Sequence, residues 1–438
     1  MSVRVLHCDD PLADPAVIAL REKLRAGGLV SAEGEQVDVP AAVREIIADV
    51  AERGDEAVID WTVRLDRAEL TPETLWVPAE QIRAAHEAAD ADFLALIRRA
   101  TANIRQYQQR IMVTAPDPLR RGGRELGVRY TPLDRVGVYV PGGRAVYPST
   151  VLMTVVPAQV AGVGEIVIAS PPLSGGDVNP MVLALAGELG VWGVLRAAGV
   201  PALAALALGT RSIQPVAKIV GPGNAFIAEA KRQLFGRVGI DSIAGPSEVL
   251  IVADETAPPK WLAADMLAQA EHDPGSAVLV TPSKDLAEKV AAEIDRQLPE
   301  LARAGAIASA LEAYSAIIVT GSLEAACDVA NDFAPEHLQI IVADERAALE
   351  RIRHAGAIFL GPHTPVPLGD YYAGPSHVLP TGGTARFFGP LSANDFLKST
   401  SLLRYDADAA NADAADVIDF ATREGLTAHA EAVRVRRD

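Results

Sequence analysis

The sequence has little cysteine, no long uninterrupted apolar run and no excess of positive charge. Cys8 and Cys327 are the only cysteines in 438 residues, too few for a disulfide framework or a thiolate zinc site. A reducing cytoplasm is therefore the expected compartment, and any metal must be bound by histidine, carboxylate or amide groups. The formal net charge of −17 argues against nucleic acid or an anionic membrane as the main partner, because both attract basic surfaces.

The sequence also leads us to expect neither a targeting segment nor a membrane segment. The N-terminal sequence MSVRVLHCDDPLADP reaches two aspartates before any apolar run develops, so no signal peptide is expected. The longest apolar stretch, residues 150–170, is interrupted by Pro157, Gln159 and Glu165, and no membrane span is expected. No GxGxxG sequence follows a predicted strand, so the usual dinucleotide fingerprint is absent.

The hydrophobic periodicity changes along the chain. Apolar residues recur at helical spacing in residues 41–66 and 91–112, which predicts amphipathic helices. From about residue 136, short β-branched runs alternate with helical stretches, as in a parallel sheet covered by helices. The predicted strands are 136–140, 165–170, 191–195, 216–220, 248–254, 276–282, 315–321, 338–344 and 356–362. These patterns predict an α/β protein with two Rossmann-like parallel-sheet units in series, a helical N-terminal region and a helical tail after residue 392.

Two glycine-proline turns are candidate ligand sites. Residues 221–224, Gly-Pro-Gly-Asn, lie between a predicted strand and a predicted helix, where free N–H groups and the helix dipole could receive a phosphate. A similar turn precedes the strand at 248. Each is by itself more simply explained as a tight turn, so no nucleotide follows from their spacing alone. Ligands in open α/β sheets bind beyond the carboxyl ends of the strands, so functional loops are expected there.

Several polar residues are candidates for metal binding. Gln269 and His272 stand three apart near the end of a predicted helix and share a face, although a lone helical histidine is more often capped or solvated. The loop 363–383 is rich in glycine and proline and long enough to suggest a function. It carries His363, Asp370 and His377. In the tail, His429 and Glu424 by themselves indicate only a solvated helix.

Glu336 and His337 directly precede the predicted strand 338–344. Two polar residues at this place can simply decorate a loop. Alternatively, a carboxylate and an imidazole are held beside a cleft, where both can transfer protons near neutral pH. The residues themselves leave both interpretations open.

Seven segments in one order resemble the histidinol dehydrogenase family. They are VYVPGGRAVYPSTVLM, GPGNAFIAEAKRQ, AGPSEVLIVAD, QAEHDP, APEHL, GDYYAGPSHVLPTGGTAR and LTAHAEAVR, and the match runs from about residue 40 to the C-terminus. The resemblance implies an oxidoreductase that converts L-histidinol to L-histidine through the aldehyde in two NAD-dependent steps, the last of histidine biosynthesis. It also implies a bound zinc that holds the substrate, and a homodimer in which the tail of one subunit completes the site of the other.

The resemblance also implies roles for individual residues. His337 would accept the hydroxyl proton as a neutral imidazole with a pKa near ~6.5, and Glu336 would take a proton from the water that attacks the aldehyde. The implied zinc ligands are Gln269, His272, Asp370 and His429, a nitrogen and oxygen set that suits zinc. The implied substrate contacts are Ser247, Gln269, His272, His337, Asp370, Glu424 and His429, with His377 lining the same pocket, and Tyr139 and Asn224 match cofactor contacts.

Four regions are predicted from the strand pattern and the resemblance together. Residues 1–34 form an N-terminal arm, and residues 35–138 plus 246–391 form a first α/β domain with the metal-binding and catalytic residues. Residues 139–245 form a second α/β domain on the cofactor side, and residues 392–438 form the helical tail.

Pro201 departs from the family pattern. Where the family usually reads Gly-Ala-Gln-Ala, this chain has Gly-Val-Pro-Ala at 199–202, and proline offers neither a side-chain donor nor an N–H to the cofactor. We therefore expect NAD to bind more weakly or in a different pose. One alternative is a paralogue that oxidises another small alcohol, such as a sulfonated diol, although Glu424 favours a substrate with an amine. Another is a non-catalytic zinc-binding scaffold, which the retained proton-transfer residues disfavour.

Overall fold

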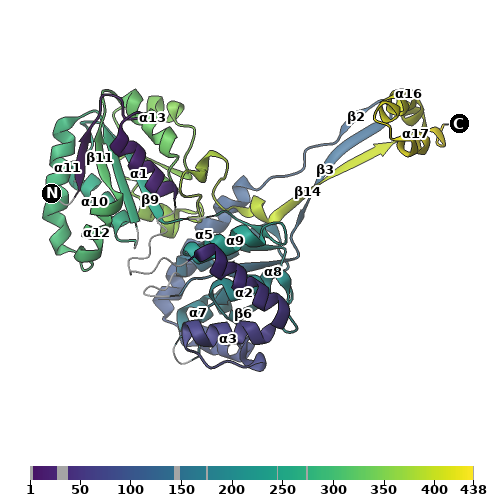
Figure 1. Ribbon diagram of the computed structural model, residues 1–438, viewed down its shortest axis with the longest axis horizontal. Coiled ribbons are helices and arrows are strands. Elements are labelled where there is room, and N and C mark those ends of the chain that lie inside the picture. Colours follow the sequence, from purple (N-terminus) through teal and green to yellow (C-terminus); the bar gives the residue numbers. More distant parts are fainter. Residues whose placement is uncertain are drawn as a thin grey trace.

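The computed structural model describes residues 3–26, 38–142, 148–173, 176–243, 245–272 and 275–437. Two lobes lie next to each other, and a long arm projects from them and carries the C-terminus near its tip (Figure 1). Parts of the predicted N-terminal arm and of three family segments lie outside the described residues, namely 1–2, 27–34, 143–147, Ala244, Asp273 and Pro274.

The first lobe is built on a six-stranded parallel sheet with the order β1-β11-β10-β9-β12-β13. The strands are β1 (Arg4–His7), β9 (Ser247–Ala253), β10 (Gly275–Thr281), β11 (Ala316–Val319), β12 (His337–Ile341) and β13 (Ala357–Leu360). Both faces are covered by helices, so the central strands are apolar on both sides. In β9, for example, Val249 and Ile251 face one core while Leu250 and Val252 face the other.

Helices cover both faces of this sheet. On one face lie α10 (Pro259–Ala270), α11 (Lys284–Gln297) and α12 (Ala304–Tyr314). On the other face lie α1 (Pro15–Arg25), α13 (Leu323–Phe333) and α14 (Glu345–Arg351).

The second lobe is built on a five-stranded parallel sheet with the order β6-β5-β4-β7-β8. Its strands are β4 (Arg135–Tyr139), β5 (Glu165–Ser170), β6 (Gly193–Arg196), β7 (Lys218–Val220) and β8 (Gly239–Ile240). One face packs against α4 (Ala79–Glu87), α5 (Ala91–Ile111), α6 (Pro148–Ala161) and α7 (Pro180–Leu189). The other packs against α2 (Val39–Arg53), α3 (Asp55–Asp66), α8 (Gly199–Leu208) and α9 (Ala225–Leu234).

The packing divides the chain differently from the predicted domain boundaries. Strand β1 pairs with β11, so the N-terminal segment is part of the first lobe rather than a separate arm. The helices between residues 39 and 111 pack on the five-stranded sheet, whereas residues 35–138 were assigned to the domain that contains 246–391. The physical reason is that an amphipathic pattern specifies a buried face but not the sheet that buries it.

The projecting arm is a three-stranded antiparallel sheet with two helices at its tip. Strand β3 (Arg124–Pro132) pairs with β2 (Leu119–Arg121) and with β14 (Leu397–Tyr405). The tip helices are α16 (Ala407–Arg423) and α17 (Thr427–Arg434). The prediction of a wholly helical tail is therefore wrong for residues 397–405, because β14 is stabilised by a partner strand some 270 positions earlier in the chain.

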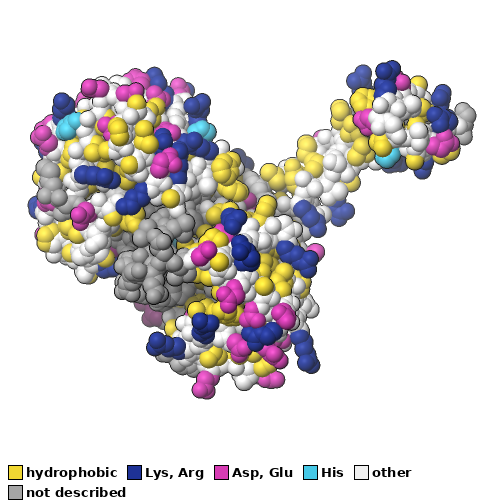
Figure 2. Space-filling view, viewed as in Figure 1, with side chains coloured by type: hydrophobic (Ala, Val, Ile, Leu, Met, Phe, Trp, Pro, Cys, Tyr) yellow, Lys and Arg dark blue, Asp and Glu magenta, His cyan; other side chains and the backbone are white. Residues whose placement is uncertain are grey.

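The arm exposes apolar side chains. Leu403 on β14 is 71% exposed and Phe420 on α16 is 70% exposed. Figure 2 shows hydrophobic side chains between the lobes and the tip, interspersed with charged ones. Isolated exposed apolar residues are common, but a thin arm that buries neither of these side chains has surface for another chain to cover. Within the described residues, no helix is long and apolar enough to cross a membrane.

Candidate active site

The two groups of predicted site residues lie at opposite ends of their sheets. Tyr139 ends β4, and the turn 221–224 directly follows β7, so these predicted cofactor residues lie at the carboxyl ends of their strands, where ligand sites are expected. Ser247 begins β9 and His337 begins β12, which pair in parallel. The predicted catalytic residues therefore lie at the amino ends of the six-stranded sheet, and for them the carboxyl-end expectation is wrong.

Glu336 is buried and held by one of its two oxygens. Its Oε2 accepts hydrogen bonds from the Ser247 hydroxyl at 2.7 Å and from the backbone N–H of Glu248 at 2.9 Å. The described residues donate no hydrogen bond to Oε1, so this oxygen is available to a ligand or water. Burial raises the pKa of Glu336, and the nearby His337 and the two hydrogen bonds only partly offset that effect. A carboxylate with a raised pKa is a better proton acceptor than an exposed one.

His337 is oriented by a backbone carbonyl. Its Nδ1 lies 3.1 Å from the carbonyl oxygen of Glu248, which can only accept, so Nδ1 carries the proton and Nε2 is the basic nitrogen of the neutral ring. Nε2 is buried 3.5 Å from Oδ1 of Asp370 and has no hydrogen-bond partner among the residues that the structure describes.

The electrostatic surroundings of His337 differ from the sequence-based expectation. Burial lowers the pKa of His337, but the carboxylates of Glu336 and Asp370 outweigh burial and raise it to about 9. The value near ~6.5 expected from the sequence is an unperturbed reference and takes no account of these two neighbours.

Three of the four predicted metal ligands belong to this end of the first lobe. Gln269 lies in the last turn of α10, and its Nε2 donates to the Ser247 hydroxyl at 2.7 Å, which leaves the amide oxygen free. His272 follows α10, and part of its surface is exposed to solvent. Desolvation by the surrounding protein lowers the pKa of its imidazole, which favours the neutral form that can bind a metal. Asp370 lies in a π-helical turn (Gly369–Ala373), and although burial raises its pKa, His337 and the other histidines lower it overall.

His377 supports the position of Asp370. Its Nδ1 lies 3.0 Å from the backbone oxygen of Asp370, seven residues earlier in the same loop. Burial lowers the pKa of His377, so the ring is neutral and donates to that carbonyl from Nδ1. The loop also contacts the second lobe, because Ser376 Oγ donates to the backbone oxygen of Met153 at 3.0 Å. The site therefore lies where the two lobes meet.

The tail residues are not brought to this site within one chain. Glu424 directly follows α16 and His429 lies in α17, and both are exposed at the tip of the arm, away from the lobes (Figure 1). Among the described residues there is no group of three or more His, Cys, Asp or Glu arranged to hold a metal ion. Of the four predicted ligands, Gln269 is an amide and His429 lies at the tip of the arm. Only His272 and Asp370 are therefore left as imidazole and carboxylate ligands in the chain's own site.

The three predicted cofactor residues lie together at the second sheet. Tyr139 is buried, its hydroxyl is hydrogen-bonded by the backbone of Gly199 in the first turn of α8, and burial raises its pKa to about 12. Asn224 caps α9, with Oδ1 accepting from the backbone N–H groups of residues 226 and 227. Pro201 is buried in the first turn of α8, where helical N–H groups have no partner in the helix, so a proline is tolerated.

Glu248 is a site residue that the sequence reasoning missed. Its Oε1 accepts from the backbone N–H of Gly382 at 3.0 Å and of Glu336 at 3.3 Å, so it ties the catalytic segment to the loop that follows His377. Burial and the neighbouring Glu336 raise its pKa to about 7. The available signal was an acidic residue at the start of an otherwise apolar strand, EVLIVA.

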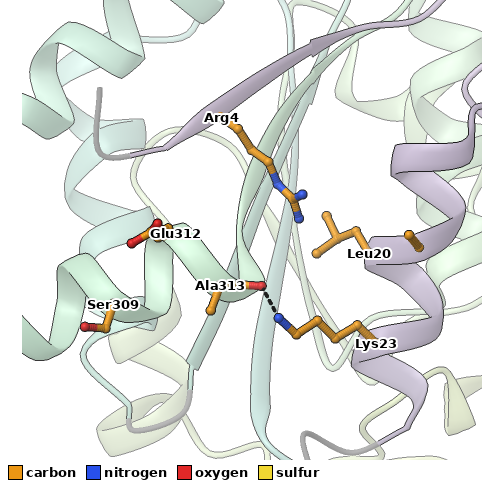
Figure 3. Close-up of a pocket in the computed structure, with 7 residues that line it drawn as sticks. Arg4, Leu20, Lys23, Ser309, Glu312 and Ala313 are labelled. Atoms are coloured by element: carbon orange, nitrogen blue, oxygen red, sulfur yellow. Dashed lines mark hydrogen bonds between the residues drawn. The ribbon is translucent and has the colours of Figure 1, made fainter.

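A separate pocket on the first lobe contains none of the predicted residues. It is lined by Arg4, Ala19, Leu20, Lys23, Ser309, Glu312 and Ala313 (Figure 3). Lys23 Nζ donates to the backbone oxygen of Ala313 at 2.8 Å and lies 4.3 Å from the centre of the Tyr314 ring. Lys23 thus caps the C-terminal end of α12, which explains its position structurally.

Comparisons with known proteins identify the family. The histidinol dehydrogenase family model matches residues 30–437. A histidinol dehydrogenase from Geobacillus kaustophilus is 52% identical over 396 residues, covering 90% of this chain and 93% of that protein. One from Rhodopirellula baltica is 47% identical over 450 residues, covering 100% of this chain and 98% of that protein.

A solved structure agrees with these sequence matches. The crystal structure of histidinol dehydrogenase from Elizabethkingia anophelis superposes with a TM-score of 0.90 at 31% identity, covering 99% of this chain and 98% of the other. The similarity therefore extends over both lobes and the arm rather than over one domain. The chain belongs to the histidinol dehydrogenase family.

Proposed function

We propose that this chain is an NAD-dependent L-histidinol dehydrogenase that oxidises L-histidinol to L-histidine through the aldehyde, the last step of histidine biosynthesis. Family membership supports the reaction, and the two buried, free cysteines fit a reducing cytoplasm. The observation that carries the proposal is a pair of uncommitted proton acceptors, Glu336 Oε1 and His337 Nε2, on adjacent residues beside Gln269 and Asp370.

In the first oxidation, His337 acts as the general base in its neutral form. The carboxylates of Glu336 and Asp370 raise its pKa to about 9, so a cation bound to Asp370 would favour that neutral form. Nε2 takes the hydroxyl proton of the alcohol, and the carbinol carbon transfers a hydride to NAD+, which gives the aldehyde, NADH and one proton. The Glu248 carbonyl holds the ring in the tautomer that exposes Nε2.

In the second oxidation, Glu336 acts on water. Its Oε1 accepts a proton from a water molecule as the resulting hydroxide adds to the aldehyde carbon, and protonated His337 returns its proton to the aldehyde oxygen, which gives the hydrate and restores the neutral ring. His337 then takes a hydroxyl proton from the hydrate as a second hydride leaves for a second NAD+, which gives the carboxylate. Ser247 and the Glu248 N–H fix Oε2, so only Oε1 faces the water.

The donor set fits zinc. We assign the ligands as the Gln269 amide oxygen, the His272 imidazole, the Asp370 carboxylate and His429 of the partner subunit. The amide oxygen is left free by the Gln269–Ser247 hydrogen bond, Asp370 favours its ionised form, and the set contains no sulfur, as the buried cysteines require. When bound, the cation would orient the substrate's amine and imidazole nitrogens and offset the negative charge of Asp370 beside His337.

A homodimer completes the site in this proposal. The arm holds His429 and Glu424 away from the lobes of their own chain and exposes apolar residues such as Leu403 and Phe420. A second subunit that covers the arm would bury this surface and receive both polar residues. Glu424 would then pair with the substrate ammonium.

NAD binds, in this proposal, at the carboxyl ends of β4, β6 and β7. Tyr139 and Asn224 lie there, and the Asn224 amide nitrogen is not used in capping α9. Pro201 removes a potential donor from the same edge, so we expect weaker cofactor binding than a glutamine would give.

A paralogue that oxidises a sulfonated diol is the second candidate. Glu424 opposes it, because a carboxylate would repel a sulfonate and attract an ammonium. We expect metal-replete protein to form two NADH for each L-histidinol and none from the diol. No NADH from L-histidinol would overturn the proposed function.

A further inference from the structure

The turn at residues 221–224 is anchored by a buried ion pair. Lys231 lies on α9 and Asp241 follows β8, and their side chains are only 2% and 4% exposed. Nζ of Lys231 donates to Oδ1 of Asp241 at 2.5 Å. Removing two charges from water costs several kcal/mol per ion in proteins, so such a pair is a poor way to add stability alone.

Both partners of this pair also bind the backbone of Gly221. Lys231 Nζ donates to the Gly221 carbonyl oxygen at 2.6 Å, and the Gly221 N–H donates to Oδ2 of Asp241 at 2.7 Å. Gly221 has a φ of 121°, and a Cβ at this residue would lie 2.2 Å from the backbone oxygen of Tyr139. The ion pair therefore holds a residue at which the turn comes so close to the end of β4 that no side chain fits.

The other end of the turn is fixed independently. Asn224 is the N-cap of α9, and its Oδ1 accepts from two backbone N–H groups of the first turn. Both ends of the turn are thus held before any ligand arrives, with the Asn224 amide nitrogen still available. A loop that is ordered in advance loses less entropy when it binds.

We propose that Lys231 and Asp241 are positioning residues for the dinucleotide, which hold Gly221–Asn224 beside Tyr139 in the binding conformation without touching the cofactor. This inference rests on the proposed function and extends it to two residues outside the binding surface. It predicts that the pair affects NAD+ affinity and leaves the chemical step unchanged.

The test uses the full-length, metal-loaded protein and titration with NAD+. Lys231→Met removes the donor to Gly221, and the double variant K231M/D241N also removes the unpaired charge while keeping an acceptor for the Gly221 N–H. We expect the dissociation constant and KM for NAD+ to rise about tenfold or more in both variants, with kcat at saturating NAD+ within about twofold of wild type. Arg232→Met is the matched control, because Arg232 is the next residue on α9 but is exposed and paired with Glu229.

Unchanged NAD+ affinity in the folded double variant would overturn the inference. A loss of kcat and of L-histidinol binding as large as the loss of NAD+ binding would overturn it too.

Hydrogen exchange on the wild type tests the inference without any substitution. The amides of residues 221, 226 and 227, which donate the hydrogen bonds that hold the turn, should be protected before NAD+ is added, and protection that appears only with NAD+ would contradict the proposal. Failure of the wild type to bind NAD+ at all would instead refute the proposed function.

Discussion

Replacing Glu336 by glutamine separates the two oxidations. Both hydrogen bonds to this side chain end on Oε2, so a glutamine can keep them with its amide oxygen and place its NH2 group where Oε1 was. That group cannot accept a proton from water. The variant should therefore keep its shape and lose only the base for the second step.

The size of the effect follows from the role of the base. General base catalysis is worth about 10²–10⁴ in rate, which corresponds to about 3–5 kcal/mol of activation free energy. The free energy of unfolding should change by less than about 1 kcal/mol. The raised pKa of Glu336 shows that the fold disfavours its ionised form, so a neutral glutamine of the same shape removes that cost. The first oxidation should slow less than the second.

The assay is NADH formation in a single turnover with either the alcohol or the aldehyde as substrate. With L-histidinol, the Glu336→Gln variant should form one NADH and stop at the aldehyde. With added L-histidinal, its rate of oxidation should be at least about 100-fold lower than that of the wild type. Glu350→Gln on α14 is the control, because that side chain is 69% exposed and forms an ion pair with Arg346 on the same helix. Aldehyde oxidation at the wild-type rate in the Glu336 variant would refute the assignment of Glu336 as the base.

Three further predictions address other parts of the account. His337→Asn should reduce both oxidations at least about 100-fold while the zinc content measured by atomic emission stays at the wild-type level, since His337 is not a proposed ligand. Pro201→Gln should lower KM for NAD+ by about two- to tenfold, the value of one added hydrogen bond. Glu188→Gln should lower stability to urea by about 1 kcal/mol at pH 7, because Arg98 lowers the pKa of Glu188 to about 2. That stabilisation is present above the unfolded pKa and is lost as the pH falls through the folded one, so the difference should be smaller at pH 3, and an equal difference at both pH values would contradict it.

The sequence predicts the buried parallel strands well and the rest of the fold less well. Runs such as EVLIVA are apolar on both faces because helices cover both sides of the sheet, and their short length, β-branched residues and flanking glycine and proline favour a strand over a buried helix. The short strand β1 and the arm strand β14 were not predicted, because each is stabilised by a partner far away in the chain rather than by a local pattern.

For the site, residue identity was predictable and geometry was not. Gln269, Glu336 and His337 could be selected from their motifs, but the hydrogen-bonded series Gln269–Ser247–Glu336 requires two parallel strands and a helix end to meet. The raised pKa of His337 and the contribution of Glu248 depend on burial and on contacts between segments about 90 residues apart, which a local pattern does not contain.

In the proposed dimer, each metal site combines Asp370 of one subunit with His429 of the other, and subunit mixing distinguishes this arrangement from a site within one chain. Asp370→Asn and His429→Ala should each be inactive alone. When the two are unfolded together and refolded, about half of the dimers should be mixed, and each should contain one intact site, so about a quarter of wild-type activity should return. If His429 serves its own subunit, no mixed dimer has an intact site, and the absence of any recovered activity would contradict the account.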